Sequence, residues 1–299
     1  MDIWRTGIAR APIAEILERG GIGGLPIQWL PHDRRSFTFL ADPFGLAADG
    51  KIHVFVEAFD YRERRGRIDV LTFDESLKLL DRSICLSEPW HLSYPCVFQD
   101  DPNIYMLPEA HRSGALTLYR AADFPCRWEA AFRLELPEVP VDATPFFHDG
   151  HWWLFYSPAG GGEASLHLAF SERLDGRWRA HPLNPLRNGN DGCRPAGRIV
   201  LIGGQLVLPV QDSLGTYGSS VRALTIHEIT TEAFECKVGS PIGSPSSLAP
   251  YDAGLHTLSA VGELTLFDVK RIDRSLTGKL IGLVGKGRRA AAGFRRQSD

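Results

Sequence analysis

Short stretches in which apolar and polar residues alternate recur along this chain, and the first one follows an acidic residue and a proline. That copy begins at residues 39–44, turns at Asp49-Gly50 and continues as the alternating stretch 51–56, which ends at Glu57. Alternation with a period of two predicts β-strands, and an Asp-Gly pair between two strands predicts a tight hairpin. Each copy is therefore expected to form a pair of antiparallel strands.

Four further copies follow at a nearly constant spacing. The anchor positions of the five copies are 52, 50, 50 and 61 residues apart and are Pro43, Pro95, Pro145, Pro195 and His256. A repeat of about 50 residues built from short strands and fixed turns is typical of propeller blades, whereas helical repeats would show apolar positions with a period of 3.6. We therefore predict an all-β, five-bladed β-propeller over residues 1–271, with blades beginning near residues 39, 92, 142, 194 and 254.

Two elements are expected before the first blade. Residues 12–20 predict a short N-terminal helix, because Pro12 suits a first helical turn and Gly20 suits a C-cap. Residues 26–31 predict an extended strand that pairs with the outer edge of a blade and helps to close the ring. Closing the ring hides strand edges that would otherwise promote aggregation.

Residues 272–299 depart from the repeat and form a basic C-terminal tail. Residues 270–299 hold nine Lys or Arg against two Asp, and the whole chain has a net charge of −3, so the other 269 residues carry −10. An acidic body argues against nucleic acid as a partner. The tail is expected to be flexible or surface-associated and dispensable for folding. The alternative is a basic amphipathic helix in weak contact with an anionic membrane surface, which the glycines of the tail disfavour.

The cysteine content and the N-terminus point to a reducing compartment. Five cysteines without a CxxC pair form neither a disulfide framework nor a zinc knuckle. The first residues lack a charged segment followed by an apolar one, and no apolar run is long enough to cross a membrane. We therefore expect a cytoplasmic protein without a cofactor. A structural cation on the propeller axis stays open, although no ligand spacing indicates one.

The residues that could carry chemistry are the ones that should converge on the axis, where the blades meet. They are the polar residues at the anchors and at the ends of the second strands, namely Asp42, Glu57, Ser93, Tyr94, Glu109, Asp142, Thr144, Arg194, Asp212, His256 and Asp268. Several carboxylates with an arginine and a histidine exceed what solubility requires, and burying charges is costly unless they pair or face water. The alternative is that these residues only join strand ends around a wet channel.

Aromatic residues and a charged turn supply two further candidates. Trp90, Trp152, Trp153 and Tyr156 are the aromatics best placed to stack on a sugar, although one residue of the pair Trp152-Trp153 should belong to the core because neighbouring strand residues face opposite ways. The turn at residues 61–66 carries three arginines. We interpret it as a solvated hairpin tip in preference to a phosphate site.

Several motifs together resemble a known family. Ala41-Asp42-Pro43, residues 142–146 and residues 254–257 resemble the first-, third- and fifth-blade signatures of five-bladed carbohydrate-active propellers, the family-43 glycoside hydrolases and their clan. A closer likeness is to the N-terminal domain of glucosamine inositolphosphorylceramide transferases and its bacterial stand-alone relatives. It covers about residues 2–270 and rests on residues 39–44, 91–95, 106–109 and 194–198, and on Gln211-Asp212 with Tyr217-Gly218.

The resemblance implies roles for some of these residues. Asp42 matches the general base of the hydrolases, Asp142 the residue that orients the base and tunes the acid, and His256 the histidine on the axis. The fourth-blade motif should supply a glutamate as general acid, but this sequence has Arg194-Pro195, and an arginine cannot donate a proton near neutral pH. Glu109 or Glu57 would then have to replace the missing acid.

Three functions remain open from the sequence. The first is a glycan-acting hydrolase with Asp42 and Glu109 as the catalytic pair, supported by Asp142. The second is a glycosyl or phosphoglycosyl transferase for a polysaccharide or glycolipid, in which Asp42 deprotonates an acceptor and Arg194 binds the phosphate of a sugar-nucleotide donor. The third is a non-catalytic glycan-binding module. The residues expected to bind the glycan or sugar nucleotide are Glu57, Tyr94, Trp152, Arg194, Asp212, His256 and Asp268.

Overall fold

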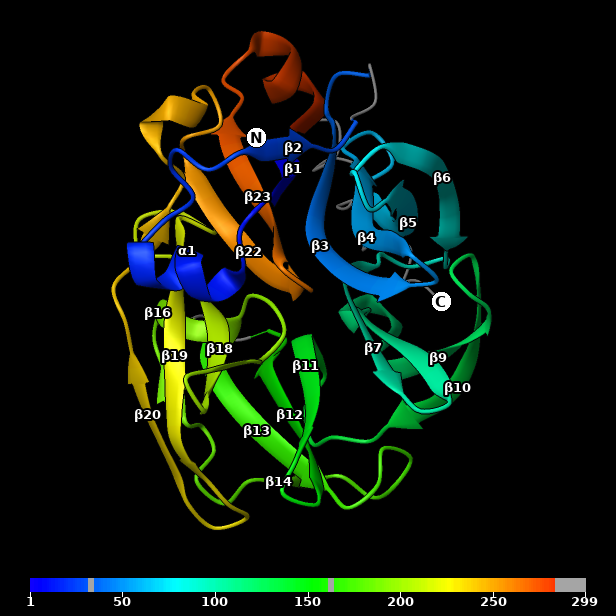
Figure 1. The fold of residues 1–299 in the computed structure, drawn as a ribbon, viewed down its shortest axis with the longest axis vertical. Helices are drawn as coiled ribbons and strands as arrows, with labels where there is room; N and C mark the ends of the chain where they lie inside the picture. The colour runs from blue at the N-terminus through cyan, green and yellow to red at the C-terminus, as the bar shows by residue number, and fades with distance from the viewer. Residues whose placement is uncertain (32–34, 161–163, 283–299) are drawn as a thin grey trace, which may run out of the picture.

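The computed structural model describes residues 1–31, 35–160 and 164–282, and it shows five β-sheets arranged around a central axis (Figure 1). The predicted five-bladed propeller is therefore confirmed. The second half of the basic tail, residues 283–299, lies outside the described residues. No helix among the described residues is long and apolar enough to cross a membrane.

The first three blades are each built from strands that follow one another in the chain. Blade 1 contains β3 (Thr38–Ala48), β4 (Lys51–Asp60), β5 (Arg65–Asp74) and β6 (Leu79–Leu86). Blade 2 contains β7 (Ser93–Asp100), β8 (Asn103–Glu109), β9 (Leu116–Asp123) and β10 (Arg127–Leu134). Blade 3 contains β11 (Pro140–His148), β12 (His151–Pro158), β13 (Ser165–Ser171), β14 (Arg179–Ala180) and β15 (Arg187–Asn188).

The last two blades are less regular. Blade 4 contains β16 (Asp191–Pro195), β17 (Val200–Ile202), β18 (Gln205–Asp212), β19 (Ser220–Ile229), β20 (Phe234–Val238) and β21 (Ile242–Gly243). Blade 5 contains β22 (Gly254–Val261) and β23 (Leu264–Ile272), and it is completed by β1 (Asp2–Ala9) and β2 (Ile27–Trp29) from the start of the chain. Two 3₁₀ helices, η1 (His111–Ser113) and η2 (Ser246–Leu248), lie in the connections.

Ring closure uses one strand more than the sequence predicted. The strand expected at residues 26–31 is β2, and it forms the outer edge of blade 5 as predicted. It reaches that blade through β1, which pairs along its whole length with β23. No element had been predicted for β1. The predicted helix is α1 (Ile13–Arg19), which ends at Gly20 in the left-handed conformation, with φ = 72°.

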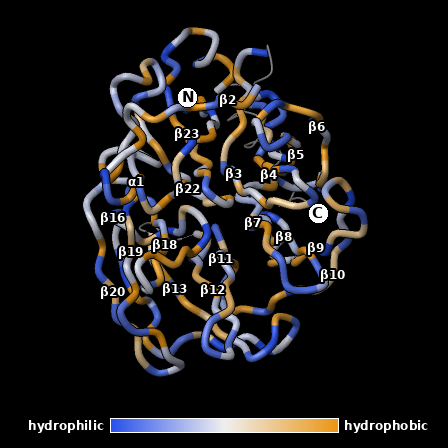
Figure 2. Tube along the Cα trace, viewed as in Figure 1, coloured by the Kyte–Doolittle hydropathy of each residue, from blue (hydrophilic) through white to orange (hydrophobic). Residues whose placement is uncertain are grey.

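The core lies between neighbouring blades. Inner strands carry mixed hydrophobic and hydrophilic positions, and their apolar side chains pack against the facing sheet (Figure 2). Trp152 and Trp153 illustrate this arrangement: the first packs in the cluster between blades 2 and 3, and the second in the cluster between blades 3 and 4. Both are buried, so the expectation that only one of them belongs to the core was wrong.

Each innermost strand carries a β-bulge at the same place. The irregularities fall at Asp42-Pro43, Tyr94-Pro95, Asp142-Ala143, Gly192-Cys193 and His256-Thr257. A bulge re-aims a side chain and disrupts the ladder locally. Asp42, Tyr94 and Asp142 adopt φ values of 50°, 45° and 50°, a left-handed conformation that is unfavourable for residues other than glycine. The propeller therefore accepts backbone strain to direct these residues.

The bulges show that the anchor prolines used to align the five copies are not equivalent in all blades. Pro43 and Pro95 are second bulge residues, but Pro145 and Pro195 lie two positions further along their strands. Arg194 is thus equivalent to Thr144, and the fourth-blade counterpart of Asp42 is Gly192. Proline occurs at both kinds of position, so the proline spacing alone could not distinguish them.

The axis is bridged below the bulges by Arg198. Its guanidinium donates to the carbonyls of Val97, Gly45 and Ala260 at 2.9, 2.7 and 3.1 Å, so one side chain of blade 4 joins blades 1, 2 and 5. The preceding Gly197 has φ = 155°, and an added Cβ would lie 1.8 Å from the carbonyl oxygen of Leu258. Only glycine therefore allows the chain to approach the axis this closely.

Candidate functional site

A charged cavity of about 230 Å³ opens at the end of the propeller where the innermost strands begin. Six of the residues predicted to converge there line it: Asp42, Glu57, Ser93, Glu109, Arg194 and His256. The bulges explain this convergence, because Asp42 and His256 occupy them and Glu57 and Glu109 face the residues just before them across the ladder. We refer to this space as the axial cavity.

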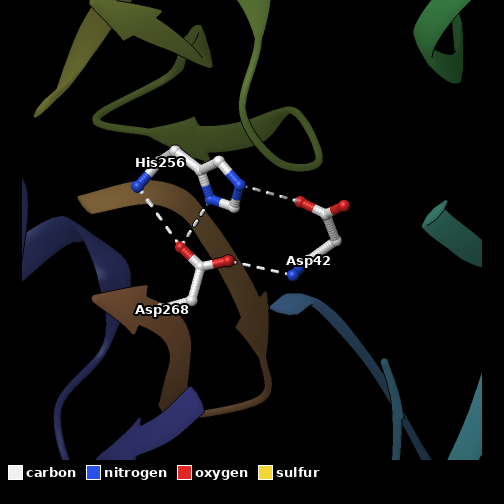
Figure 3. A group of neighbouring side chains, drawn as sticks. All are labelled: Asp42, His256 and Asp268. Atoms are coloured by element: carbon white, nitrogen blue, oxygen red, sulfur yellow. Dashed lines mark hydrogen bonds and ion pairs between the residues drawn. The ribbon is translucent and has the colours of Figure 1, made fainter. Parts of the chain in front are cut away.

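Asp42 is held in a hydrogen-bonded group with His256 and Asp268 (Figure 3). Asp268 accepts hydrogen bonds from His256 Nδ1 at 2.7 Å and, through its other oxygen, from the backbone N–H of Asp42 at 2.9 Å. The Nε2 atom of His256 then faces Asp42 Oδ1 at 3.6 Å. Thr257 donates its hydroxyl to the same oxygen at 3.1 Å, and the backbone N–H of Tyr94 donates to Oδ2 at 3.2 Å. The carboxylate of Asp42 is therefore firmly oriented.

The surroundings of Asp42 bring its pKa close to neutrality. Burial, opposed by the positive charge of His256 and reinforced by Asp268 and Asp142, raises the pKa of Asp42 to about 7. Burial lowers the pKa of His256, but Asp268 and Asp42 outweigh it, so that this pKa is raised. A carboxyl group with a pKa near the working pH suits general acid–base chemistry.

Asp42, His256 and Asp268 each offer an atom within 4.8 Å of the others and could in principle surround a metal ion. Their hydrogen bonds do not favour such an ion. Asp268 Oδ1 already accepts from His256 Nδ1 and from the backbone N–H groups of His256 and Thr257. The carboxylate oxygens of Asp42 and Asp268 each accept at least one hydrogen bond from the protein itself.

The two glutamates of the cavity have opposite protonation behaviour. Burial and the negative charges of Asp42 and Glu109 raise the pKa of Glu57 well above its usual value. Burial would do the same for Glu109, but the hydrogen bond with His111, the charge of Arg194 and the hydroxyl of Ser93 lower its pKa to about 2. Burial and its acidic neighbours thus favour the protonated form of Glu57, whereas the partners of Glu109 favour its ionised form.

His91 approaches Glu57 as a neutral hydrogen-bond donor. The backbone N–H of Gly66 donates to His91 Nδ1 at 2.8 Å, so the ring proton sits on Nε2, which lies 3.5 Å from Glu57 Oε1. Burial lowers the pKa of His91 to about 4 and keeps the ring uncharged. His91 was part of the sequence resemblance but had not been predicted as a site residue.

Arg194 enters the cavity with its charge already paired. Its Nε donates to Asp142, and Gln211 donates to the same carboxylate at 3.0 Å. Although burial disfavours the charged form, Asp142 and Glu109 raise the pKa of Arg194 well above its usual value. Asp142 does not line the cavity itself. It is buried behind Arg194, where it orients the guanidinium.

The closing strand β1 supplies the remaining wall. Trp4 stacks on His256 with ring centroids 3.7 Å apart, and Tyr217 meets both rings edge-on. The buried Lys270 fixes this corner, since its ammonium lies 5.4 Å from the centre of the Trp4 ring and donates to the carbonyl of Tyr217. Other lining residues absent from the predicted set are Asp2, Phe39, Phe59 and Tyr61, of which only Phe39 lies in a motif that carries the family resemblance.

Four predicted ligand-binding residues lie outside the cavity lining. Tyr94 places its hydroxyl across the axis, where it accepts from the N–H of Gly197 at 2.8 Å. Trp152 packs against Phe98 in the core. Asp212 pairs with Arg222 at 2.7 Å and shapes the loop that carries Tyr217, while Asp268 acts through His256. In the structure these four residues support the residues around the cavity and do not line it.

Five blades around a carboxylate-lined axial cavity define a five-bladed β-propeller, the fold also found in several solved glycoside hydrolases. A family 117 glycoside hydrolase from Zobellia galactanivorans matches with a TM-score of 0.58 at 13% identity, over 80% of this chain and 87% of that one. The catalytic domain of a GH62 α-L-arabinofuranosidase from Coprinopsis cinerea matches with a TM-score of 0.58 at 13% identity, over 80% of this chain and 93% of that one. At such identities the likeness shows the fold alone.

The sequence itself gives the family. The chain belongs to the family described as Glucosamine inositolphosphorylceramide transferase 1, N-terminal, which matches residues 31–248. Glucosamine inositolphosphorylceramide transferase 1 of Arabidopsis thaliana is 33% identical over 254 residues, covering 83% of this chain and 32% of that protein. The protein of the same name from Oryza sativa subsp. indica is 34% identical over 205 residues, covering 66% and 27%. The chain thus spans about a third of the length of these relatives.

Proposed function

We propose that this protein is a glycan-acting enzyme that processes a single sugar unit in the axial cavity, with Asp42 as the general base. The observation that carries the proposal is the pKa of Asp42, which its surroundings raise to about 7 while His256, Thr257 and Tyr94 hold the carboxylate in one orientation. Such a group can take a proton from a hydroxyl or a water near neutral pH.

Glu57 is the best candidate for the proton donor that blade 4 lacks. Its pKa is raised well above the usual value, so it holds a proton that it can give to a leaving group, whereas Glu109 is ionised down to about pH 2. The pairing of Asp42 with Glu109 is therefore replaced in our proposal by Asp42 with Glu57. Glu109 instead stabilises positive charge in the cavity.

The size of the cavity supports a small ligand. Its volume of about 230 Å³ lies below the ~300–1,000 Å³ of typical small-molecule pockets, which suits one sugar ring better than a length of chain. Trp4 and Phe59 line it and give apolar surface beside the carboxylates. The expected substrate is a glycan or sugar conjugate that presents a terminal sugar.

The test separates base from acid by the quality of the leaving group. A panel of aryl glycosides is assayed with wild type, Asp42→Asn and Glu57→Gln. Loss of the base should lower turnover by about 10²–10⁴ for every leaving group. Loss of the acid should matter for poor leaving groups and little for nitrophenolate, which departs without a proton. Full activity of Asp42→Asn on all substrates would refute the proposal.

Transfer from a phosphorylated donor is the second candidate, and the charge of Arg194 favours it. The guanidinium stays protonated, lines the cavity and stands where the hydrolases are expected to have an acid. A phosphate leaving group needs no strong proton donor. Arg194→Ala should then weaken binding of sugar nucleotides by about 1.5–3 kcal/mol and leave neutral glycans unaffected, as measured by calorimetry with Arg194→Lys as control. Equal affinity of all three proteins for sugar nucleotides would exclude this role.

A non-catalytic glycan-binding module is the third candidate. The observation in its favour is that the matched region covers only 27–32% of the named transferases, so their activity can reside in the remainder of those proteins. Here the cavity would bind sugar without turnover. Binding of a glycan that survives unchanged with the wild-type protein, over the whole panel, would identify this function.

A further inference from the structure

The molecule has a second charged surface, beside the axial cavity and opposite to it in sign. Two adjoining hollows share Glu63 and Arg65: the first is lined by blade 1 and the segments next to it, and the second lies between blades 1 and 2. Phe59 of the cavity lining also lines the first hollow, and His91 lines the second. We call the two hollows together the arginine groove, after the residues that line it: Arg35, Arg64, Arg65, Arg67 and Arg112. Asp60 and Glu63 are the acidic residues on the same walls, so positive charge is in excess.

The groove is a built feature that joins two blades. Arg112 of η1 in blade 2 reaches the hairpin tip of blade 1 and donates to the carbonyl of Arg64 at 3.5 Å. The N–H of Leu92 donates to the carbonyl of Gly66 at 3.0 Å and fixes the same tip. The turn interpreted from the sequence as a solvated hairpin tip therefore lies against its neighbour and forms a wall.

Several side-chain hydrogen-bond donors on the walls of the groove are available to bind a ligand. Within the described part of the chain, Arg65 and Arg112 are exposed and make no ion pair. Trp90 lines the groove as well, and its indole N–H is buried without a hydrogen-bond partner among the described residues. Buried donors of this kind are usually satisfied by water or by a ligand.

The axial cavity is less suited to an anion than the groove. Among the described residues that line it, Arg194 is already paired with Asp142 and His256 with Asp268, while Glu109 and Asp2 add negative charge. An anionic group attached to a sugar in the cavity would be repelled there and attracted to the neighbouring groove. Guanidinium groups pair with phosphate oxygens through two parallel hydrogen bonds, which makes clustered arginines suited to phosphate.

We propose that the arginine groove is a phosphate-binding subsite, which holds the phosphate of a sugar conjugate whose sugar occupies the axial cavity. That the two sites act on one ligand rests on the proposed function, whereas phosphate binding in the groove does not. The ligand class is a sugar joined to a phosphate or phosphodiester. Its source is either a soluble sugar phosphate or a lipid with a phosphodiester headgroup.

The experiment measures binding by calorimetry to the full-length protein, with inorganic phosphate, glucose 1-phosphate and glucose as probes. The variants are Arg65→Ala, Arg112→Ala and the pair combined, and Arg173→Ala is the control, because this exposed arginine on blade 3 removes the same charge elsewhere. Each groove variant should weaken binding of phosphate and glucose 1-phosphate by about tenfold. Binding of glucose and the behaviour of Arg173→Ala should stay as in wild type.

A second arm distinguishes the source of the phosphate. Phosphatidylcholine vesicles with and without phosphatidylglycerol are sedimented with the same proteins. Arginine-dependent binding to the charged vesicles supports a lipid conjugate, and arginine-dependent binding of glucose 1-phosphate alone supports a soluble one. If neither probe binds, or if binding is the same in the groove variants and in wild type, the subsite is wrong.

The outcomes also separate this inference from the proposed function. Asp42→Asn should bind phosphate as wild type does, because Asp42 lies in the cavity and not in the groove. Arginine-dependent phosphate binding without turnover of any glycoside would refute the catalytic proposal and leave the subsite intact. Should Arg65→Ala fold poorly, Arg65→Gln keeps the polar stem and tests the same charge.

Discussion

Arg194 and Arg198 stand four residues apart in blade 4, and they serve opposite ends of the propeller axis. Arg194 lines the axial cavity with its charge paired to Asp142, whereas Arg198 donates to backbone carbonyls of three other blades. The residues beside Arg198 come from the far ends of the inner strands, including Phe98 and Phe146, and form a separate, more apolar hollow. An arginine thus lines the candidate site at one end of the axis, and another arginine joins the blades at the other end.

Arg194 and Arg198 differ in the groups that pair with their positive charge. A carboxylate can be protonated, so the pairing of Arg194 depends on pH and on the ligand. Carbonyl groups cannot titrate, so the contacts of Arg198 do not depend on pH. Function is therefore expected at the end of the axis where charges face other ionisable groups. The predictions below test that distinction.

The largest effect is expected from removing each arginine in turn. Arg198→Met leaves carbonyls of three blades unpaired and should lower the free energy of unfolding by about 3 kcal/mol at every pH. Arg194→Met should cost a similar amount at about pH 8, and less on acidification, because burial already raises the pKa of Asp142 and a neutral Asp142 needs no cation. Urea unfolding at several pH values measures both.

The contrast would be lost if the two variants showed the same pH dependence. Arg82→Met is not a suitable control, since Arg82 pairs with the buried Asp69. Arg173→Met removes an exposed arginine and should leave stability nearly unchanged.

A smaller effect is expected from pH on the wild-type protein. The pKa of Asp42 is about 7 in the folded state against 3.8 for an unperturbed aspartate, and that of Glu57 is also raised. The folded protein then binds more protons, so its stability should fall as the pH rises from about 4 through 7, by up to ~1.4 kcal/mol per pH unit and group. Glu109 has the opposite sign, and its contribution should disappear only as the pH falls from about 4.5 to 2.

His91 opposes this fall between about pH 4 and its ordinary pKa of 6.5, because burial lowers the pKa of His91 to about 4. The contribution of Asp42 is therefore read from the difference in stability between wild type and Asp42→Asn, and activity should rise with pH through about 7 as Asp42 loses its proton. Asp42→Asn removes one titrating group, so its free energy of unfolding should change less between about pH 4 and 7 than that of wild type. If the stability difference between wild type and Asp42→Asn did not change between pH 5 and pH 8, Asp42 would not be protonated as described.

The smallest effect is expected from the tail. A chain ending at Arg271 should lose less than ~2 kcal/mol of unfolding free energy, because the large apolar side chains Leu276 and Leu280 of the described tail segment are exposed. The contacts removed include the carbonyl of Asp273, which accepts from the N-terminal ammonium at 2.9 Å, and Ile281, which packs beside Met1. A greater loss of unfolding free energy, measured by urea unfolding, would show that the tail is an integral part of the fold at the cavity end.

The blades could be predicted from the sequence because the strands and turns that form each blade are close together in the chain. Asp49-Gly50, for example, takes φ values of 51° and 67°, as a tight hairpin turn requires, and both residue types favour that conformation. The strand β1 could not be found in this way. Its partner β23 lies more than 250 residues away, and residues 2–9 carry no turn signal or repeat of their own.

The charged members of the site were largely predictable, but Asp142 lies behind the cavity and the electrostatics could not be predicted. Asp42, Glu57, Glu109, Arg194 and His256 were expected in one cavity, and the structure brings them together. The contrast between Glu57 and Glu109 depends on His111, Ser93 and Arg194, whose distances no spacing gives. Trp4 and Tyr217 reach the cavity from β1 and from a loop, so the inner-strand pattern could not reveal them.

The pairing of β1 with β23 makes the cavity the last part of the molecule that synthesis can complete. Trp4 is synthesised about 250 residues before His256 and Lys270, the neighbours that it needs at the cavity. Until β23 has been made, β1 can pair only with the short strand β2, and the ring stays open. Contacts between such distant segments form slowly, so newly made chains should pass through an open-ring stage that lacks a finished site.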